Sequence, residues 1–410
     1  MAWLSGWSYR KAITLSRASG AVSNYQMKLL VGESSGATGE SVDCAAHVKT
    51  DFSDLRFTAA DGSTLLDYWI ESVSGATPNQ LATVWIEFGS IGTGATTFYM
   101  YYGNAGAAAV SNGTNTFLLF DHFDDASVSS ALWNLAGTPT ESGTTLTLNG
   151  NQEGIYSKTT WTQNVALRAK AKLSNATSAV FGMVGFRSAA TTPAIEWVSY
   201  GNAAAFDTPY AHVTADLIGA NQGAMNTEHI YDLAWISDRS KYAYDNGAWV
   251  DLTTQVPSAA LPVELMLFTA GAAVETCDWI FVRQYLAVEP AWGSWGEERA
   301  FGSTLSISPG AFSVNGTAVA LKCNLILKAD PGSYGLTGNS IKLMKGTPLV
   351  LGPGSFSMIG SPMELRCGNM HLDLDPGSFS LVGKSMSLPY SWYRGDASAN
   401  YEFRKQRRNF

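Results

Sequence analysis

The sequence predicts an all-β protein, and three observations support this prediction. Aromatic residues make up 12% of the 410 residues and glycine contributes 40, whereas charged residues make up only 15%; this composition favours strands and turns over helices. Apolar and polar residues alternate in many short stretches, which is the pattern of half-buried strands. A short unit that begins with Pro-Gly recurs four times near the C-terminus, as in proteins built from stacked β units. We therefore expect almost no long helix.

Residues 1–115 are predicted to form a β-sandwich. Asp61-Gly62 separates two apolar runs, and Asp-Gly in this setting is a strong hairpin signal. Short alternating strands joined by turns are typical of sandwich domains. The expected strands cover residues 7–15, 25–31, 54–57, 65–71, 82–88 and 96–102.

Several motifs in this first domain resemble a domain of unknown function that is common in bacterial and archaeal surface proteins and in phages. The resemblance implies no catalytic residues, because the family has none established. The motifs are Trp-x-Tyr-Arg-Lys-x-Ile at 7–13, Asp-Leu-Arg-Phe at 54–57, Tyr-Trp-Ile-Glu at 68–71 and Tyr-Tyr-Gly-Asn at 101–104.

Residues 117–300 form a second predicted domain. It opens with Phe-Asp-x-Phe-Asp-Asp at 120–125 and closes with Asp-Trp-Ile-Phe-Val-Arg at 278–283. An Asn-Gly turn within residues 241–249 predicts a hairpin. The segment resembles a laminin-G-like, concanavalin A-type jelly roll. A linker with two tryptophans is expected at 287–301.

The repeats fill residues 304–390 and predict a stalk of stacked β units. One slot of the unit is always Phe or Tyr, and its spacings are 22, 22 and 23 residues. A unit this small must bury its apolar face against neighbouring repeats or partner chains. We expect a β-solenoid or a triple β-spiral in a homotrimer, with the aromatic residues as an assembly ladder. The segment resembles repeats of phage structural proteins and viral fibre shafts. The slot is filled by Phe312, Tyr334, Phe356 and Phe379.

The last segment, residues 391–410, is predicted to be a basic tail. Such a tail is either solvated or docks on an acidic protein surface. Its basic residues are Arg404, Lys405, Arg407 and Arg408.

Charge and hydropathy exclude two classes of partner. The net charge of −8 argues against nucleic acid, which needs a basic surface. No apolar run approaches the roughly 20 residues of a membrane span, and the N-terminus has no signal-peptide pattern. We expect a chain made in a cytosol whose domains act outside the cell, as in a virion. A secreted chain whose signal peptide has been removed is the alternative.

The sequence lacks the paired acids of a glycosidase. Concanavalin A-type enzymes that cleave β-glucans carry Glu-x-Asp-x-x-Glu on one strand, and two such carboxylates supply the nucleophile and the acid. The nearest segment, residues 275–278, has the wrong spacing, and residues 195–198 offer only Glu196. We therefore expect a protein that is not an enzyme.

Two other kinds of site are predicted in the second domain. Asp121, Asp124 and Asp125 could bind Ca²⁺, a hard cation that prefers oxygen ligands; the alternative is that they cap a turn. No other cofactor is expected. Exposed aromatic side chains could stack on sugar rings, and the candidates are Trp249, Tyr244 and Tyr242.

These observations lead to one functional prediction with two alternatives. We expect a bacteriophage virion structural protein, a tail fibre or spike that binds host cell-surface glycan and contacts other virion proteins. A capsid decoration or head-fibre protein without a receptor role is the first alternative. A secreted polysaccharide-binding, lectin-like protein is the second.

Overall fold

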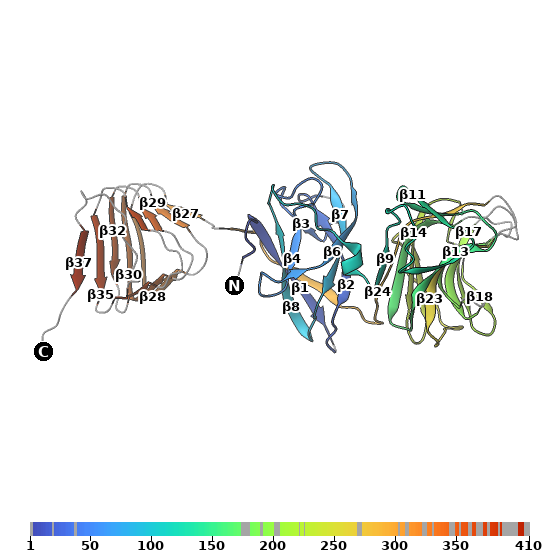
Figure 1. Cartoon of the computed structure of the whole chain (residues 1–410). Coiled ribbons are helices and arrows are strands. Elements are labelled where there is room, and N and C mark those ends of the chain that lie inside the picture. The colour runs from blue at the N-terminus through green and yellow to red at the C-terminus, as the bar shows by residue number, and fades with distance from the viewer. Residues whose placement is uncertain are drawn as a thin grey trace. The chain divides into compact units, whose positions relative to one another are not determined.

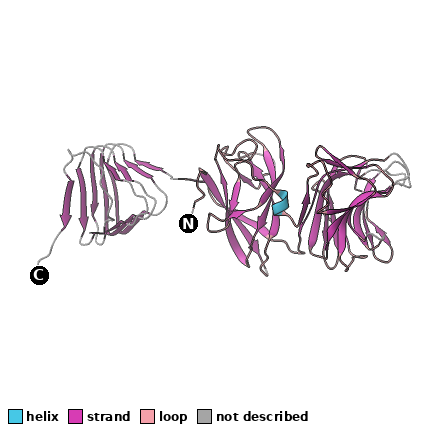
Figure 2. Ribbon diagram, in the orientation of Figure 1, coloured by secondary structure: helices cyan, strands magenta, loops and turns pink. Residues whose placement is uncertain are grey.

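The computed structural model describes residues 3–301, except 19, 37–38, 174–180, 189–191, 201–205, 221, 225 and 269–272, together with strands between 304 and 405 (Figure 1). Almost all regular structure is β (Figure 2), and α1 (Gly113–Thr116) is the one helix in the described part of the chain. None of the described helical structure is long and apolar enough to cross a membrane. The predicted all-β fold class is confirmed.

The first domain is a β-sandwich of two sheets. In the β4–β5 hairpin, the Asp61 carboxylate accepts hydrogen bonds from the backbone N–H groups of Ser63 and Thr64, both at 2.9 Å. One sheet has the order β3-β2-β7-β6, with β2 (Tyr25–Gly32), β3 (Val42–Asp43), β6 (Tyr68–Ser74) and β7 (Leu81–Phe88). The other has the order β25-β1-β8-β4-β5 with β26 beside β1, and comprises β1 (Tyr9–Arg17), β4 (Arg56–Thr58), β5 (Leu65–Leu66), β8 (Gly94–Tyr102), β25 (Ala291–Trp295) and β26 (Arg299–Ala300).

The segment predicted as a linker belongs to this sandwich. β25 pairs with β1 in antiparallel register, with Leu15 opposite Trp292 and Ile13 opposite Trp295. The Trp292 indole N–H also donates to the Lys28 carbonyl at 2.9 Å. The two tryptophans give the segment apolar surface to bury, which explains why it pairs instead of remaining a free linker. The jelly roll is thus inserted between β8 and β25, and the predicted second domain ends too late at residue 300.

The second domain consists of two facing sheets, as predicted for a jelly roll. One has the order β10-β13-β23-β15-β16-β17-β18 with β19 beside β17: β10 (Trp133–Ala136), β13 (Glu153–Trp161), β15 (Phe181–Arg187), β16 (Ala194–Tyr200), β17 (Phe206–His212), β18 (Asp216–Ile218), β19 (Gly223–Ala224) and β23 (Leu261–Phe268). The other has the order β11-β12-β24-β14-β20-β21-β22 with β9 beside β24: β9 (Leu119–Asp121), β11 (Thr140–Ser142), β12 (Thr145–Leu148), β14 (Val165–Lys172), β20 (His229–Trp235), β21 (Ser240–Tyr244), β22 (Val250–Leu252) and β24 (Glu275–Gln284).

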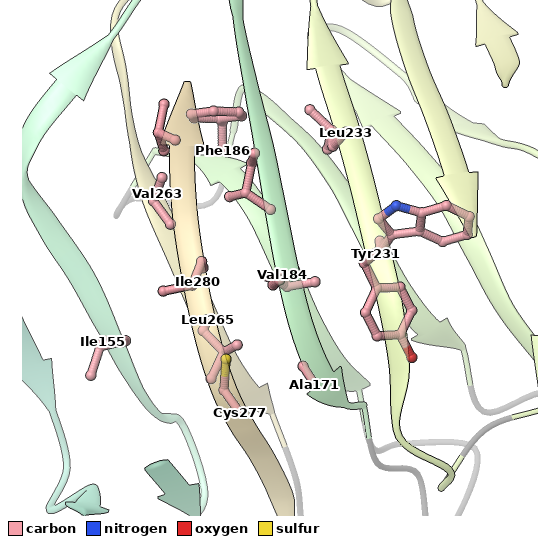
Figure 3. Close-up of a cluster of buried hydrophobic side chains, with 14 of the residues drawn as sticks. Ile155, Ala171, Val184, Phe186, Tyr231, Leu233, Val263, Leu265, Cys277 and Ile280 are labelled. Atoms are coloured by element: carbon pink, nitrogen blue, oxygen red, sulfur yellow. The ribbon is translucent and has the colours of Figure 1, made fainter. Parts of the chain in front are cut away.

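The core of the jelly roll lies between these two sheets. Alternate residues of each strand point into it, as the two-residue period of a strand requires. Figure 3 shows part of this cluster, with Val184, Leu265 and Ile280 drawn from strands of both sheets. Every second residue of β15, β16 and β23 therefore points to the other face of its sheet, away from this core.

The sandwich packs against the sheet that contains β14, β20 and β24. An aromatic cluster joins the two domains, and Phe117 stacks on Phe281 with ring centroids 3.9 Å apart. Arg168 of β14 forms a buried ion pair with Glu71 of the sandwich at 2.9 Å and a second one with Asp232. Removing one partner of a buried ion pair is costly, so these contacts fix the domains to each other. The cluster comprises Trp69, Trp85, Phe117, Trp279 and Phe281.

The C-terminal repeats pair in parallel within one chain, as in a β-solenoid. Each aromatic slot is in register with the next: Phe312 opposite Tyr334, Tyr334 opposite Phe356, and Phe356 opposite Phe379. One sheet has the order β27-β29-β31-β34, with β27 (Thr304–Ile307), β29 (Ile326–Ala329), β31 (Leu349–Leu351) and β34 (Leu372–Leu374). The other contains β28 (Ala311–Leu321), β30 (Gly332–Leu343), β32 (Gly354–Ile359), β33 (Met363–Leu365), β35 (Ser378–Gly383), β36 (Met386–Ser387) and β37 (Tyr401–Lys405).

The predicted tail contains a further strand of this stack. β37 pairs in parallel with β35, and Tyr401 lies opposite Phe379, which precedes it by 22 residues, within the 22–23-residue spacing of the earlier repeats. Arg404 and Lys405, predicted as part of a docking tail, are opposite Val382 and Gly383 in this pairing. Arg407 and Arg408 lie outside the described residues. Because the segment is rich in basic residues, it was predicted to be a tail, and Tyr401 was not placed in the aromatic position of a further repeat.

Candidate functional site

A row of polar and aromatic residues crosses the outer face of the β13-β23-β15-β16-β17 sheet. Its members are directly opposite one another on neighbouring strands, so their side chains share one face. The residues beside them, such as Ile195 and Leu265, point into the core, so the row faces away from it. We call this set the outer row: Asn134, Tyr156, Glu264, Gly185, Glu196 and Tyr210.

Gly185 separates the two glutamates of the outer row. A Cβ atom at this position would lie 2.3 Å from the carbonyl oxygen of Ile195 and 2.6 Å from the Cα atom of Glu196. No side chain fits there, because the contact is with backbone atoms. The close approach of β16 to β15 thus leaves the position between Glu264 and Glu196 without a side chain.

Arg187, two residues after Gly185 on the same face, contacts both glutamates. Its Nη1 atom lies 3.0 and 3.2 Å from the two carboxylate oxygens of Glu196. Its Nε atom lies 3.9 Å from Oε1 of Glu264. Glu196 and Glu264 are buried, whereas the Arg187 side chain is 20% exposed. One guanidinium therefore serves two carboxyl groups and holds Glu196 more closely.

Both glutamates bind protons more tightly than usual. Burial raises the pKa of Glu196, although the Arg187 charge opposes the shift. Burial raises the pKa of Glu264 well above its ordinary value, and the charge of Glu196 adds to this effect. Two carboxyl groups that share one cation favour holding one proton between them. Because Arg187 is closer to Glu196, we assign the proton to Glu264 and the ion pair to Glu196.

Half-buried tyrosines lie on either side of the acid pair. The rings of Tyr156 and Tyr210 pack against an apolar cluster that contains Met183 and Met266. The Tyr210 hydroxyl donates to Asp216 at 2.7 Å. Burial raises the pKa of Tyr156 to about 12, and the charge of Glu264 contributes, so its hydroxyl remains protonated and able to donate a hydrogen bond.

The residues predicted to bind glycan do not form a site together. Tyr242 is fully buried, and its hydroxyl donates to the Tyr210 carbonyl at 2.7 Å. Tyr244 packs against the core, with its ring centroid 4.3 Å from that of His229. Trp249 is 38% exposed and lies 5.9 Å from the Tyr285 ring. The structure therefore corrects the prediction for Tyr242 and Tyr244, since strand alternation turns both into the core, and leaves Trp249 at the surface.

Two of the three aspartates predicted to bind calcium cap turns, and the third contacts a histidine. Asp121 accepts hydrogen bonds from the Trp133 indole at 2.6 Å and from the Phe123 N–H at 3.0 Å. Asp124 contacts His122 at 3.3 Å, and Asp125 accepts from the Ser127 N–H at 3.3 Å. Within the described residues, no group of three or more His, Cys, Asp or Glu side chains could hold a metal ion. The geometry supports the turn-capping alternative.

Sequence reasoning considered Glu196 as a single acid and did not consider Glu264. The two belong to strands that are distant in the sequence, and only their common neighbour β15 brings them to one face. The sequence nevertheless marks Glu264, because it is the one charged residue of the strand Leu261–Phe268. A charged residue within a largely apolar strand marks a position that needs a partner or a role.

Comparisons with known proteins give one family match and several similar folds. The family model of a domain of unknown function (DUF2341) matches residues 51–136, which run from the sandwich into β10 of the jelly roll. A search of curated proteins gives no match.

Several solved structures are similar to part of this chain. A β-1,3-1,4-glucanase (lichenase) from a mouse hindgut metagenome is 12% identical, with 41% of this chain and 99% of that chain covered and a TM-score of 0.35. An endo-β-1,3-glucanase from Pyrococcus furiosus is 12% identical, with 42% and 94% covered and a TM-score of 0.35. An immunostimulatory antigen and pseudo β-1,3-glucanase of Mycobacterium tuberculosis is 13% identical, with 42% and 99% covered and a TM-score of 0.35.

These matches contradict the prediction that the chain is not an enzyme. Proteins named as glucanases and glycosyl hydrolases are among the similar structures, so the absence of one acidic motif was too narrow a basis for that prediction, and it is withdrawn. At these identities, what the matched proteins bind or cleave is a property of those proteins and is not carried over to this chain.

Proposed function

We propose that the protein binds a glycan along the outer row of the jelly roll. The observation that carries the proposal is the order of residues across the sheet, in which two half-buried tyrosines flank an acid pair and a glycine. Aromatic rings offer flat apolar faces with a polar edge, which suits the alternating apolar and hydroxyl surfaces of a sugar.

The dimensions of the outer row suit an extended oligosaccharide. Tyr156 and Tyr210 are four strands apart, and neighbouring strands are separated by roughly 4.8 Å, so the two rings are about 19 Å apart along the row. Several sugar units fit over this length. Gly185 lies midway between the two tyrosines and adds no side chain to the row, because backbone atoms of β16 fill the place of a Cβ atom.

Hydrogen-bonding groups are distributed along the same row. The amide of Asn134 is exposed beside Tyr156, and the Arg187 guanidinium is partly exposed beside Gly185. The Tyr156 and Tyr210 hydroxyl groups stay protonated, because burial raises the pKa of each. These donors and acceptors supply the few positioned polar contacts that ligand sites use for specificity.

The test is binding of the full chain to a panel of soluble polysaccharides by affinity electrophoresis, followed by calorimetry on any positive glycan. Tyr156→Ala and Tyr210→Ala should each weaken binding by about tenfold, since an aromatic contact of this kind is worth roughly 1 kcal/mol or more. Trp249→Ala is the matched control, because Trp249 is exposed on the opposite sheet. The same samples are assayed for released reducing ends. Release that Glu264→Gln abolishes would extend the function from binding to cleavage.

Two results would overturn the proposal. If no glycan binds, the outer row has only a structural role. If Trp249→Ala abolishes binding while the two tyrosine variants leave it unchanged, the ligand lies on the other sheet, as the sequence first indicated.

The biological setting that we propose for this binding is a bacteriophage fibre or spike with several copies of the chain. The parallel register of the repeats supports an elongated assembly segment, and several copies would raise the avidity of a weak site. Light scattering after size exclusion tests the homotrimer directly. A monomer would favour a decoration subunit or a secreted lectin.

A further inference from the structure

The Lys28 side chain of the sandwich is in contact with the Asn246 side chain of the jelly roll. Lys28 is on β2, and Asn246 is in the turn that joins β21 to β22. The Nζ atom of Lys28 lies 3.1 Å from Oδ1 of Asn246. Arg168 of β14 donates a hydrogen bond from Nη2 to the same Oδ1 atom at 2.7 Å. A primary amine and a carboxamide from two domains thus meet, and a guanidinium binds the amide oxygen.

Both groups are held in place by the elements that carry them. The backbone carbonyl of Lys28 accepts a hydrogen bond from the Trp292 indole at 2.9 Å. Asn246 is in a tight hairpin turn, in which Asp245 and Asn246 have positive φ values of 48° and 61°. The Asp245 carboxylate accepts a hydrogen bond from the Ile230 N–H at 2.9 Å, which ties the turn to β20. The contact between the amine and the amide is therefore supported on both sides.

Lys28 is hydrogen-bonded to an uncharged amide, whereas the nearby acids are paired with an arginine. Glu71 and Asp232 both form ion pairs with Arg168. Burial lowers the pKa of Lys28, and the charge of Arg168 adds to this effect, although the two acids oppose it. A lysine that is desolvated beside another cation becomes a nucleophile, because its neutral amine has a free electron pair.

Arg168 also activates the acceptor amide. A donor at Oδ1 stabilises the negative charge that this oxygen takes up when an amine adds to the amide carbon. Asn246 is exposed, so water has access to carry a proton between the nitrogen atoms, and ammonia can leave. In an Asn-Gly sequence the following backbone nitrogen is a competing nucleophile. Here that N–H, of Gly247, donates to the Tyr244 carbonyl at 2.7 Å, which disfavours the competing reaction.

We propose that Lys28 and Asn246 react to form an isopeptide bond that links the sandwich to the jelly roll. The electron pair of the lysine Nζ adds to Cγ of Asn246, and the π electrons of the amide move onto Oδ1. The intermediate then expels the amide nitrogen, which takes up the proton lost by Nζ and leaves as ammonia. One C–N bond forms and one breaks, so the step needs no oxidant or reductant. This inference does not depend on glycan binding by the outer row.

Mass spectrometry of the full chain tests the proposal. We expect an intact mass that is lower than the mass of the sequence by one molecule of ammonia. A tryptic digest should contain a branched peptide that joins Lys28 to Asn246, because trypsin does not cleave after a lysine whose amine is acylated. The protein is measured when freshly purified and again after incubation at mildly alkaline pH, where more of the amine is neutral and an incomplete reaction should finish.

Two variants and a control assign the bond. Lys28→Arg keeps a cation but removes the primary amine, and Asn246→Gly removes the amide but accepts the positive φ of the turn. Both should have the full mass of their sequences and unfold at a lower temperature than wild type, because a covalent link between distant residues restricts the unfolded chain. Lys11→Arg is the control, since Lys11 of the same domain pairs with the Asp43 carboxylate at 3.1 Å, and this variant should still lose ammonia.

The outcomes separate the alternatives. The full mass of the sequence in wild type, both before and after the alkaline incubation, would overturn the proposal. Loss of ammonia that persists in Lys28→Arg would also overturn it, because a cyclic imide formed by Asn246 and Gly247 has the same mass and needs no lysine. If Lys28→Arg does not fold, Asn246→Gly and the branched peptide of the wild type decide.

Discussion

The jelly roll contains two pairs of buried carboxyl groups that differ in their surroundings. Glu196 and Glu264 lie on the outer face of one sheet and share Arg187. Asp207 and Glu275 point between the two sheets. Asp207 accepts a hydrogen bond from the Tyr231 hydroxyl, and a backbone hydrogen bond from Met183 opposes the rise in the pKa of Glu275. The first pair contacts a guanidinium directly, whereas the second pair feels the charges of His229 and Lys172, which lower the pKa values less than burial raises them.

The difference shows that burial alone does not decide what a carboxyl group does. Burial raises the pKa of all four groups. In the outer pair, the guanidinium allows one group to stay ionised while the other holds a proton, which suits a polar site at a surface. In the inner pair burial outweighs the nearby charges, so both groups hold their protons to a higher pH than usual.

Removing Arg187 should have the largest effect. Arg187→Met leaves Glu196 buried without a counterion, and breaking a buried ion pair in this way costs about 3–5 kcal/mol. The loss at neutral pH should shrink in acid, because Glu196 and Glu264, whose pKa values are already raised, then take up protons. Urea unfolding of the full chain at neutral and acidic pH measures both effects.

Arg239→Met is the matched control for this variant. Arg239 pairs with Asp238 and Asp251 at the surface, where its side chain is 36% exposed, and exposed pairs are worth roughly 0.2–1 kcal/mol. If Arg187→Met and Arg239→Met lose the same free energy of unfolding, burial does not determine how strongly Arg187 stabilises Glu196 and Glu264.

The inner pair should make stability depend on pH. Burial raises the pKa of Asp207 from 3.8 to about 6, so the folded state holds this proton to higher pH than the unfolded state does. The stability contributed by this group is therefore complete below about pH 4 and falls as the pH rises to about 6, by about 3 kcal/mol in total. Unfolding in urea with EDTA, compared between wild type and Asp207→Asn from pH 4 to 7, measures the difference.

Asp207→Asn should lack this pH-dependent contribution to the free energy of unfolding, so the stability of the variant relative to wild type should rise with pH. Asp238→Asn serves as the control, because the exposed Asp238 has a pKa held below its ordinary value by Arg239 and should not show the same trend. Parallel pH profiles for wild type and Asp207→Asn would show that Asp207 titrates normally in the folded protein.

Much of the fold could be predicted because its determinants are local. Alternation of apolar residues located the strands, and Asp61-Gly62 marked the β4–β5 hairpin. The 22-residue period placed Phe312 in register with Tyr334, although the same period was not followed as far as Tyr401. The insertion of the jelly roll into the sandwich could not be predicted from local patterns. It depends on the pairing of Leu15 with Trp292, which are far apart in the sequence.

The candidate sites depend on pairings of this long-range kind. Glu196 and Glu264 share Arg187 only because β15 lies between their strands, and Asp207 and Glu275 point into the same core only because their sheets face each other. Glu196 and Glu264 are each the one charged residue of a largely apolar strand, whereas the strands of Asp207 and Glu275 carry further polar residues. Which acids would be partners, and which face each would occupy, follows from strand order and cannot be obtained from spacing along the chain.

The smallest expected effect distinguishes the two members of the outer pair. Glu196 contacts Arg187 through both carboxylate oxygens, whereas Glu264 lies 3.9 Å from it and is the group to which we assign the proton. Glu196→Gln should therefore cost about 1.5–3 kcal/mol, the range for hydrogen bonds to charged groups, and Glu264→Gln should cost less than about 1 kcal/mol. Urea unfolding of the two variants side by side at neutral pH measures the difference, and each serves as the control for the other. A larger loss for Glu264→Gln would reverse the assignment, placing the ion pair on Glu264 and the proton on Glu196.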